Sequence, residues 1–304
     1  MRIGLVTGGR WHNEPYLYLK QKGIKLTIFD DSPKCYLKRK YNISPLKLSK
    51  MKIFKNIIFW SPCNDKGSAL SDYYNKKNNL NVRIRSNKKN LEIFDKKIYA
   101  NQENQTSYEK KKYLLKSRFG SGSKNINFWG GEKYNKKKFY LEKFFNGFEL
   151  SVEMISIDGI HNIFAYSLRI IKKIKSAIAL VSLKNSKKFN DYLLNTLTKH
   201  LNKYKIINGV THVELIIDKK KKIKIIDTNT RCPGAGLTDY YYKLLTRQNL
   251  FEIDYKIILK NLKKIKKKFD NNHGLILYDD LNSSNFEHNL KKYSKKIQYF
   301  NLEF

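Results

Sequence analysis

Residues 209–236 read GVTHVELIIDKKKKIKIIDTNTRCPGAG, and no other stretch of the sequence says as much about the fold. Two largely apolar runs, 210–217 and 223–228, are separated by one aspartate and four lysines. Both runs are rich in β-branched residues, and the charged residues between them suit a solvent-exposed turn. The stretch therefore predicts a β-hairpin.

The register of this hairpin follows from its turn. If Asp218 pairs with Ile223, Glu214 lies directly opposite Asp227, because paired residue numbers in an antiparallel ladder have a constant sum. Opposed residues have Cβ atoms about 4.5–5.5 Å apart. Asn229 comes two residues after Asp227 and points from the same face of the strand. Two carboxylates and an amide oxygen are therefore expected to converge.

Two opposed carboxylates repel each other unless a cation compensates them. Mg²⁺ prefers oxygen ligands of this kind together with phosphate oxygens. Glu214, Asp227 and Asn229 are therefore candidate metal ligands. The alternative is a solvated hairpin that carries incidental acidic residues.

The residues after the hairpin add a cation and a turn. The guanidinium of Arg231 can make bidentate contacts to a phosphoryl group beside a metal site. The Pro-Gly-Ala-Gly run at 233–236 predicts a turn whose backbone amides approach an anion. An ion pair with acidic neighbours is the alternative role for Arg231. Cys232 has no nearby base in the sequence, and we interpret it as a packing residue.

A glycine–serine loop follows an apolar strand predicted at 113–116. Lys116 ends this strand, and the sequence FGSGS follows at 119–123. Such a loop can donate backbone N–H groups to phosphates while the lysine supplies positive charge. The nucleotide-binding motif GxxxxGK[ST] is absent. A flexible linker is the alternative.

A second acidic segment, LEKFFNGFELSVEM, covers residues 141–154. Glu142, Phe144 and Phe145 lie at the end of a predicted strand, and Glu149 follows a turn. The strand end offers an apolar surface and backbone groups for an adenine, and Glu149 offers a carboxylate for ribose hydroxyls. An ordinary edge strand with solvated acids is the alternative.

Elsewhere the pattern alternates strands with helices. In the first 90 residues this alternation predicts a parallel α/β sheet. Farther along, Asp158-Gly159 predicts a turn between two strands, and apolar residues at helical spacing predict two later helices. The predicted strands are 3–6, 24–29, 57–60, 139–144, 149–157 and 161–167, and the predicted helices are 15–22, 68–77, 189–203 and 251–269.

The composition limits the classes of protein that fit. The chain of 304 residues has a net charge of +36, but its lysines are spread along the whole sequence. No apolar run approaches the roughly 20 residues of a membrane span. Cys35, Cys63 and Cys232 lack metal-ligand spacing and indicate reduced thiols in a reducing compartment. These features indicate a cytoplasmic protein with no membrane partner, for which nucleic acid is not expected as a specific partner.

The ordered set YLLKSRFGSGS, LEKFFNGFELSVEMISIDG and GVTHVELIIDKKKKIKIIDTNTRCPGAG resembles the ATP-grasp superfamily over roughly residues 1–245. The resemblance implies an α/β and α+β architecture, with a pre-ATP-grasp Rossmann-like domain followed by a two-lobed ATP-grasp fold. The implied domains are residues 1–90, a small lobe at 91–148, and a large lobe with a basic C-terminal region at 149–304.

The resemblance also implies roles for single residues. Glu214, Asp227 and Asn229 would hold Mg²⁺ (Mn²⁺ is also compatible), and Arg231 and Arg169 would stabilise the transferred phosphoryl group. Lys116 would contact the α- and β-phosphates and thereby assist catalysis. The remaining nucleotide contacts would come from Lys96, from the phosphate-covering loop Gly120, Ser121, Gly122 and Ser123, from Glu142, Lys143, Phe144 and Phe145 at the adenine, and from Glu149 at the ribose.

The implied activity is an ADP-forming ligation of a small-molecule carboxylate to an amine through an acyl phosphate, by a monomer or a homodimer. Substrate contacts are expected near residues 8–13, 63–67 and 231–239. The family more often has glutamate where Asp227 stands, and the segment between Lys96 and Lys116 is short.

Three other functions fit parts of the sequence. A dinucleotide-dependent oxidoreductase is loosely compatible with Gly8-Gly9 and Asp30, although GxGxxG is missing. The basic charge is compatible with a non-catalytic nucleic-acid-binding protein. A degenerate ATP-grasp protein would bind nucleotide without catalysis.

Overall fold

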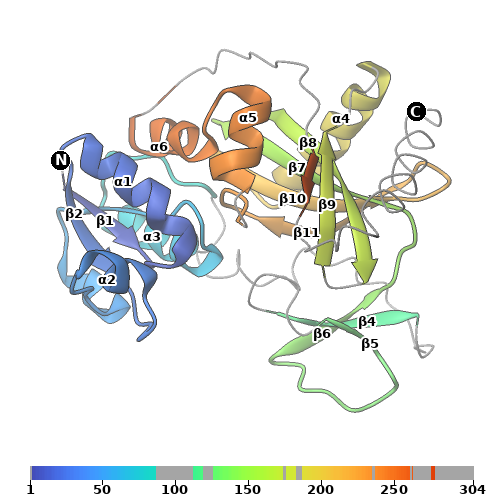
Figure 1. Ribbon diagram of the computed structural model, residues 1–304, viewed down its shortest axis with the longest axis horizontal. Helices are drawn as coiled ribbons and strands as arrows, with labels where there is room; N and C mark the ends of the chain where they lie inside the picture. Colours follow the sequence, from blue (N-terminus) through green and yellow to red (C-terminus); the bar gives the residue numbers. More distant parts are fainter. Residues whose placement is uncertain are drawn as a thin grey trace.

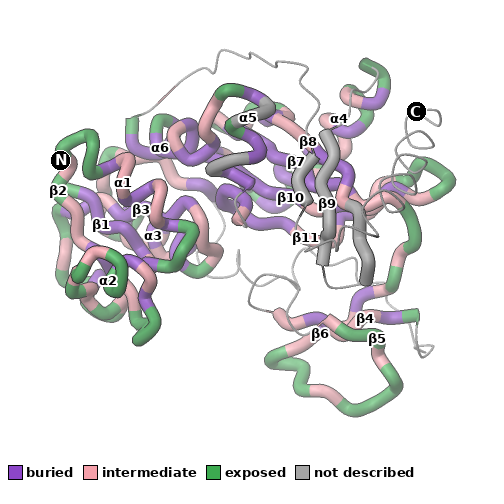
Figure 2. Tube along the Cα trace, viewed as in Figure 1, coloured by how far each residue is buried: buried purple, intermediate pink, exposed green. Residues whose placement is uncertain are grey.

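A computed structural model gives the structure of residues 2–86, 112–118, 126–173, 176–182, 187–234, 237–260, 262 and 275–277. These residues form three β-sheets (Figure 1). Buried residues concentrate in the first sheet, the large sheet and helix α6, whereas the small sheet is mostly half-buried or exposed (Figure 2). No helix in these ranges is long and apolar enough to cross a membrane.

The first sheet is parallel, as predicted, with the strand order β2-β1-β3. Apolar side chains point from both of its faces, which explains the nearly continuous apolar runs of its strands. Helix α1 packs on one face through Tyr16 and Leu19, and α3 packs near Phe59 on the other. The elements are β1 (Arg2–Val6), α1 (Asn13–Gln21), β2 (Lys25–Phe29), α2 (Tyr36–Tyr41), β3 (Ile58–Trp60) and α3 (Asp65–Lys77), with short 3-10 helices at Arg10–His12 and Leu48–Ile53.

The small sheet is antiparallel, with the order β5-β4-β6, and it lies below the other two sheets in Figure 1. Its strands are β4 (Tyr113–Ser117), β5 (Asn127–Phe128) and β6 (Phe139–Lys143). The register pairs Lys116 with Tyr140 and Leu114 with Glu142.

The large sheet has six antiparallel strands in the order β11-β10-β7-β8-β9-β12. One face is apolar and packs against α4 through residues such as Leu150, Val213 and Leu197. The character of the other face changes along β7: Ile155 belongs to the apolar core, whereas Glu149 nearer the start of the strand is polar. The elements are β7 (Phe148–Ile157), β8 (Ile160–Lys173), β9 (Ser176–Ser182), α4 (Lys187–Lys203), β10 (Gly209–Ile217), β11 (Ile223–Asn229), a π-helix at Leu237–Tyr241, α5 (Tyr242–Thr246), α6 (Leu250–Lys260) and β12 (Leu275–Leu277).

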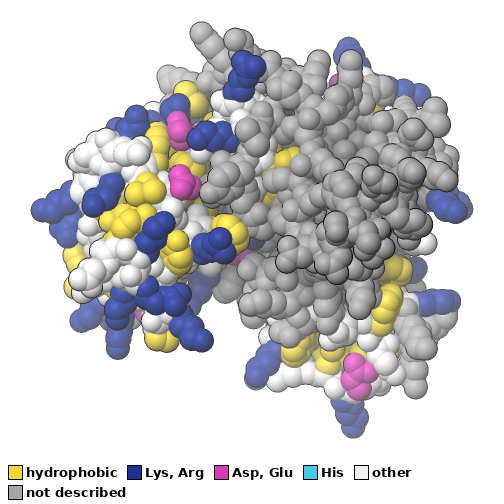
Figure 3. Space-filling model, viewed as in Figure 1, with side chains coloured by type: hydrophobic (Ala, Val, Ile, Leu, Met, Phe, Trp, Pro, Cys, Tyr) yellow, Lys and Arg dark blue, Asp and Glu magenta, His cyan; other side chains and the backbone are white. Residues whose placement is uncertain are grey.

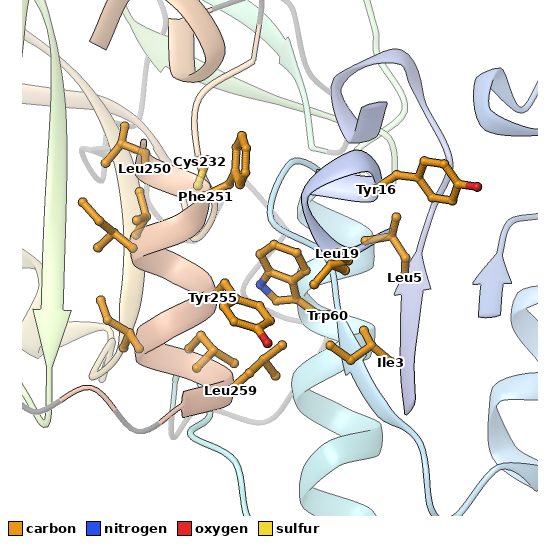
Figure 4. Packing of buried hydrophobic residues seen from close by; sticks show 14 of the residues in the cluster. Ile3, Leu5, Tyr16, Leu19, Trp60, Cys232, Leu250, Phe251, Tyr255 and Leu259 are labelled. Atoms are coloured by element: carbon orange, nitrogen blue, oxygen red, sulfur yellow. The ribbon is translucent and has the colours of Figure 1, made fainter. Parts of the chain in front are cut away.

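Helix α6 joins the first sheet to the large sheet in one apolar core (Figure 4). The ring of Trp60 lies between Tyr255 of α6 and Leu19 of α1, and the Trp60 and Tyr255 centroids are 5.7 Å apart. Burial of large aromatic side chains contributes strongly to such an interface. The first sheet is therefore held in place relative to the polar face of the large sheet.

A buried carboxylate lies at the centre of this junction. Asp254 accepts a bidentate pair from Arg85, and it also accepts from the Trp60 indole at 2.8 Å and from the Val210 N–H at 3.0 Å. Gly209, at φ +91°, is required here because a Cβ atom would lie 2.5 Å from Arg85 Nη1. Each partner comes from a different part of the chain, so this one side chain links the two sheets.

Several sequence predictions differ from the structure. The helix predicted at 251–269 ends at Lys260, and Leu262 lies outside it. The pairing of Asp218 with Ile223 is wrong, because Ile217 pairs with Ile223 and Asp218 belongs to the turn. Helices α2 and α5 were not predicted, since neither has more than six residues and little periodicity is visible in so short a segment.

We predict that Asp254→Ala lowers the free energy of unfolding by about 3–5 kcal/mol, because it leaves the buried Arg85 charge without its partner. Equilibrium urea unfolding measures this loss. Glu252→Ala is the matched control, because Glu252 pairs with Lys256 at 3.9 Å on the surface of the same helix and should contribute less than about 0.5 kcal/mol. A loss below about 1 kcal/mol for Asp254→Ala would show that this junction is not critical.

Candidate functional site

A β-bulge sets the acidic pair on the β10–β11 hairpin. The ladder starts with Ile217 opposite Ile223, a register that by itself would leave Glu214 opposite Ile226. A register shift between Glu214 and Leu215 leaves Ile226 as the extra residue, and Glu214 then pairs with Asp227. The predicted opposition of the two carboxylates is confirmed, although the turn from which it was predicted pairs differently.

Lys116 connects the small sheet to this bulge. Its Nζ donates to the Ile226 carbonyl at 2.8 Å and to Glu142 Oε2 at 3.2 Å, and both side chains are buried. The carbonyl of a bulged residue has left the regular ladder and is available to such a donor. The bulge therefore places Asp227 opposite Glu214 and at the same time receives the lysine of the other sheet.

Arg169 connects two more carboxylates. It lies opposite Glu149 in the β7–β8 ladder, and its Nη1 contacts Glu149 Oε1 and, at 2.7 Å, Glu214 Oε1. Ion pairs to a largely buried guanidinium offset the repulsion between these two acids. Glu149 and Glu214 thus lie on either side of one cation.

The pKa shifts of Glu142 and Glu149 show that the acidic residues of the two sheets lie close to one another. Burial raises the pKa of Glu142, and although Lys116 opposes this rise, the charge of Asp227 adds to it. Burial also raises the pKa of Glu149 to about 7, against the effect of Arg169 and with added repulsion from Glu214 and Asp227. The acidic residues of both sheets therefore act on one another in a single site.

A histidine that was not predicted belongs to this site. His212 Nδ1 lies 2.8 Å from Glu153 Oε1, and its Nε2 lies 3.3 Å from Glu214 Oε1. Burial alone would lower the pKa of His212, but the charge and hydrogen bond of Glu153, together with Glu214, raise it to about 9. A signal was present in the sequence: His212 is two residues before Glu214 on a strand, so both side chains point from one face.

The negative side chains of the site outnumber the positive ones, which favours the binding of a divalent cation. Among the described residues, five carboxylates lie with Lys116, Arg169 and the imidazolium of His212, and burial raises the pKa of Glu149 to about 7, so part of the negative charge is neutralised by a proton that a divalent cation would displace. The carboxylates are Glu142, Glu149, Glu153, Glu214 and Asp227.

Glu214, Asp227 and the amide oxygen of Asn229 are the hard oxygen donors that suit Mg²⁺. The Asn229 amide nitrogen donates to Asp227 Oδ2 at 3.2 Å. No cluster of three or more His, Cys, Asp or Glu side chains suited to a metal occurs in the described ranges. A cation here would therefore need ligands besides carboxylates, such as the amide of Asn229 and the oxygens of a phosphate.

Arg231 faces the first sheet from the loop after β11. Its Nε lies 2.9 Å from Asp65 Oδ1 at the start of α3, and its Nη1 donates to the Cys232 carbonyl at 2.9 Å. Ser68 donates to the Thr230 carbonyl at 2.8 Å from the same helix. Arg231 thus forms an ion pair, although with Asp65 of α3 rather than with an acidic neighbour in its own segment, and the pair fixes the guanidinium where the two parts of the chain meet.

The strand ends of the first sheet meet this loop. His12 is buried, with its Nε2 3.2 Å from Ser61 Oγ and 3.3 Å from Thr7 Oγ1. Burial and the nearby charge of Arg231 lower the pKa of His12 to about 3, so it is neutral at pH 7. Trp11 lies beside Gly234 and is partly exposed. The loop at 231–234 therefore adjoins the segment at 8–13, and the prediction that both contact a substrate stays a prediction.

The predicted adenine segment follows β6. Phe144 is 39% exposed and packs edge-to-face on Phe128 with centroids 5.1 Å apart, while Lys224 lies 4.9 Å from the ring centroid of Phe145. The Phe144 N–H already donates to the Lys112 carbonyl at 2.8 Å. The exposed aromatic surface next to Lys143 is compatible with a planar ligand. Lys96, Gly120, Ser121, Gly122 and Ser123 lie outside the described residues.

A family model described as an ATP-grasp domain matches residues 121–239. A search of curated proteins gives no match.

Solved structures show the fold. The L-amino acid ligase of Bacillus licheniformis aligns with a TM-score of 0.60 at 14% identity, over 85% of this chain and 74% of that one. The N5-carboxyaminoimidazole synthetase of Staphylococcus aureus, complexed with ADP, gives 0.63 at 13% identity over 95% and 96%. The biotin carboxylase domain of the Hydrogenobacter thermophilus 2-oxoglutarate carboxylase, complexed with MgADP and bicarbonate, gives 0.51 at 14% identity over 84% and 69%.

We predict that His12 makes the protein sensitive to acid. With its pKa lowered from 6.5 to about 3, His12 binds fewer protons when folded than when unfolded. Stability should therefore fall as the pH falls below 6.5, by roughly 3 kcal/mol at pH 4. His12→Gln removes this contribution, so its stability should depend less steeply on pH.

Urea unfolding of both proteins at pH 7, 5.5 and 4 measures the difference. Parallel stability curves for the wild type and His12→Gln would contradict a neutral, buried His12.

Proposed function

We propose that this chain, which carries an ATP-grasp domain in an ATP-grasp fold, is an ATP-dependent ligase that joins a carboxylate to an amine with release of ADP and phosphate. The observation that supports this most strongly is the convergence of Lys116 from the small sheet with Glu149, Arg169, Glu214 and Asp227 from the large sheet. Triphosphate chemistry requires cations and metal-binding oxygens in one place.

The nucleotide would lie between the small and large sheets. Lys116 would contact its phosphates, and Glu149 would bind the ribose hydroxyls. The adenine would lie against the segment of Glu142, Lys143, Phe144 and Phe145, where an aromatic surface is exposed. The glycine–serine loop at 120–123 would cover the phosphates, and Lys96 would reach the nucleotide from the preceding segment.

Glu214, Asp227 and Asn229 would hold the metal. When bound there, Mg²⁺ would neutralise the phosphate oxygens and orient the γ-phosphate. The excess negative charge of the site makes its affinity for a divalent cation depend on all of the surrounding carboxylates. We also propose that the small lobe covers residues 91–148 and the large lobe residues 149–304.

The reaction would proceed in two displacements. A carboxylate oxygen of the substrate attacks the γ-phosphorus, the bond to the β–γ bridging oxygen breaks, and ADP leaves with that electron pair. The amine nitrogen then attacks the acyl carbon, and phosphate leaves as the amine loses a proton. Arg169 and Arg231 would stabilise the charge on the transferred group through charge-assisted hydrogen bonds.

The carboxylate substrate would enter beside Arg231, between the loop at 231–234 and the segment at 8–13. His12 is neutral there and brings no charge of its own, so Arg231 would supply the attraction for an anion, although Asp65 offsets part of its charge. Among the similar structures, one is an L-amino acid ligase and another an N5-carboxyaminoimidazole synthetase, so carboxylates and amines of amino-acid size are the first candidates.

ADP release tests the proposed function. Purified protein with ATP and Mg²⁺ is screened against a matrix of small carboxylates and amines. We expect ADP release that requires one carboxylate and one amine together. Nucleotide binding without ADP release in any combination would instead indicate a binding protein without catalysis.

We predict that Asp227→Ala lowers the rate of ADP release on the order of 100-fold or more, because charge stabilisation of the phosphoryl group is lost. Its melting temperature should not fall, since the substitution removes one of several mutually repelling carboxylates. Asp191→Ala, on the exposed face of α4, is the matched control and should retain wild-type turnover. Near-normal ADP release by folded Asp227→Ala would contradict the assigned role.

A further inference from the structure

A row of polar residues crosses the large sheet beside the proposed metal ligands. The ladders pair His212 with Glu153 on β7 and with Asn229 on β11. The next row on the same face pairs Glu214 with Ser151 and with Asp227. His212 therefore lies one row behind Glu214 and Asp227, and Asn229 shares its row.

His212 bridges two carboxylates. Its Nδ1 lies 2.8 Å from Glu153 Oε1 and its Nε2 lies 3.3 Å from Glu214 Oε1, and His212 and Glu153 are buried. An ionised carboxylate has no proton to donate, so both ring nitrogens act as donors. Glu153 thereby fixes the orientation of the ring, and the ring holds Glu214.

Glu214 is restrained from two sides. Arg169 Nη1 donates to Glu214 Oε1 at 2.7 Å from β8, and His212 reaches the same oxygen along β10. A glutamate has three rotatable bonds, and two donors on one oxygen exclude most of its rotamers. A carboxylate fixed in this way presents a defined geometry to a cation.

Stability alone does not explain the arrangement. The ladder hydrogen bonds already hold β7 to β10 along their whole length, and replacing a buried ion pair by apolar residues is often neutral or stabilising. Among the described residues, no hydrogen bond of good geometry reaches the buried Glu153 Oε2, although the Tyr242 hydroxyl lies near this carboxylate, and burial of that oxygen adds a further cost. Polar groups retained against such costs are typical of functional sites.

We propose that His212, oriented by Glu153, is a positioning residue that holds Glu214 in the geometry required for Mg²⁺-dependent nucleotide binding. This inference rests on the proposed function. It adds two buried side chains, one on β7 and one on β10, that do not touch the substrates themselves.

Two uncharged variants separate positioning from packing. The amide nitrogen of asparagine lies near the Nδ1 position of histidine, and that of glutamine lies near the Nε2 position. His212→Asn therefore keeps a donor toward Glu153 and loses the donor to Glu214, whereas His212→Gln does the reverse. Both variants lose the imidazolium charge, so each serves as the control for the other.

The experiment titrates Mg²⁺ into each protein with a fluorescent ADP analogue and measures the concentration at half-maximal binding. We expect an increase of at least about tenfold for His212→Asn and at most about threefold for His212→Gln. In thermal melting, His212→Gln should have the lower melting temperature of the two variants, because His212→Asn keeps its bond to buried Glu153.

Equal Mg²⁺ dependence in both variants, or a larger increase for His212→Gln, would overturn the positioning role. If the wild type showed no Mg²⁺-dependent nucleotide binding, the proposed function would fail and this inference with it. Intact wild-type binding with indistinguishable variants would overturn the inference alone.

Discussion

The arrangement depends on the repulsion among carboxylates that the fold brings together and partly buries. Glu142, Glu149, Glu214 and Asp227 each raise the free energy of the folded state unless cations lie among them. Lys116, Arg169 and His212 supply part of that compensation from three different strands. In the proposed function, the remaining negative charge would attract a metal ion that accompanies the nucleotide. Folding and the proposed ligand binding would then be linked through the same few charges.

Two local features make this convergence possible. The bulge at Ile226 returns Asp227 to the face of Glu214 and offers its carbonyl to Lys116, so one irregularity joins the two sheets. The apolar core around Trp60 (Figure 4) and the Asp254 junction then hold the first sheet against the loop that carries Arg231. On the parts of this face that are not grey in Figure 3, lysine and arginine side chains lie at several separate places, with apolar and other side chains between them. The large net charge therefore says less about function than the few acidic residues do.

Much of the fold was predictable, because strand alternation and helix periodicity are local. The parallel first sheet and the hairpin at Asp158-Gly159 are confirmed. The opposition of Glu214 and Asp227 is also confirmed, but the bulge that produces it was not foreseen, since pairing at a turn depends on the whole sheet. Arg169 was predicted beside the phosphates, whereas its contacts with Glu149 and Glu214 needed the β7–β8 register. His212 was missed although it stands two residues before Glu214, whereas its contact with Glu153 needed the three-dimensional ladder, because the two residues come from segments about 60 residues apart.

The most direct test of the central claim is a crystal structure of the protein with Mg²⁺ and ADP. We expect Mg²⁺ to be bound by oxygens of Glu214, Asp227 and Asn229 and by phosphate at about 2.0–2.1 Å, with Lys116 in contact with the phosphates. A nucleotide bound elsewhere, or a metal ion without ligands from the β10–β11 hairpin, would contradict it.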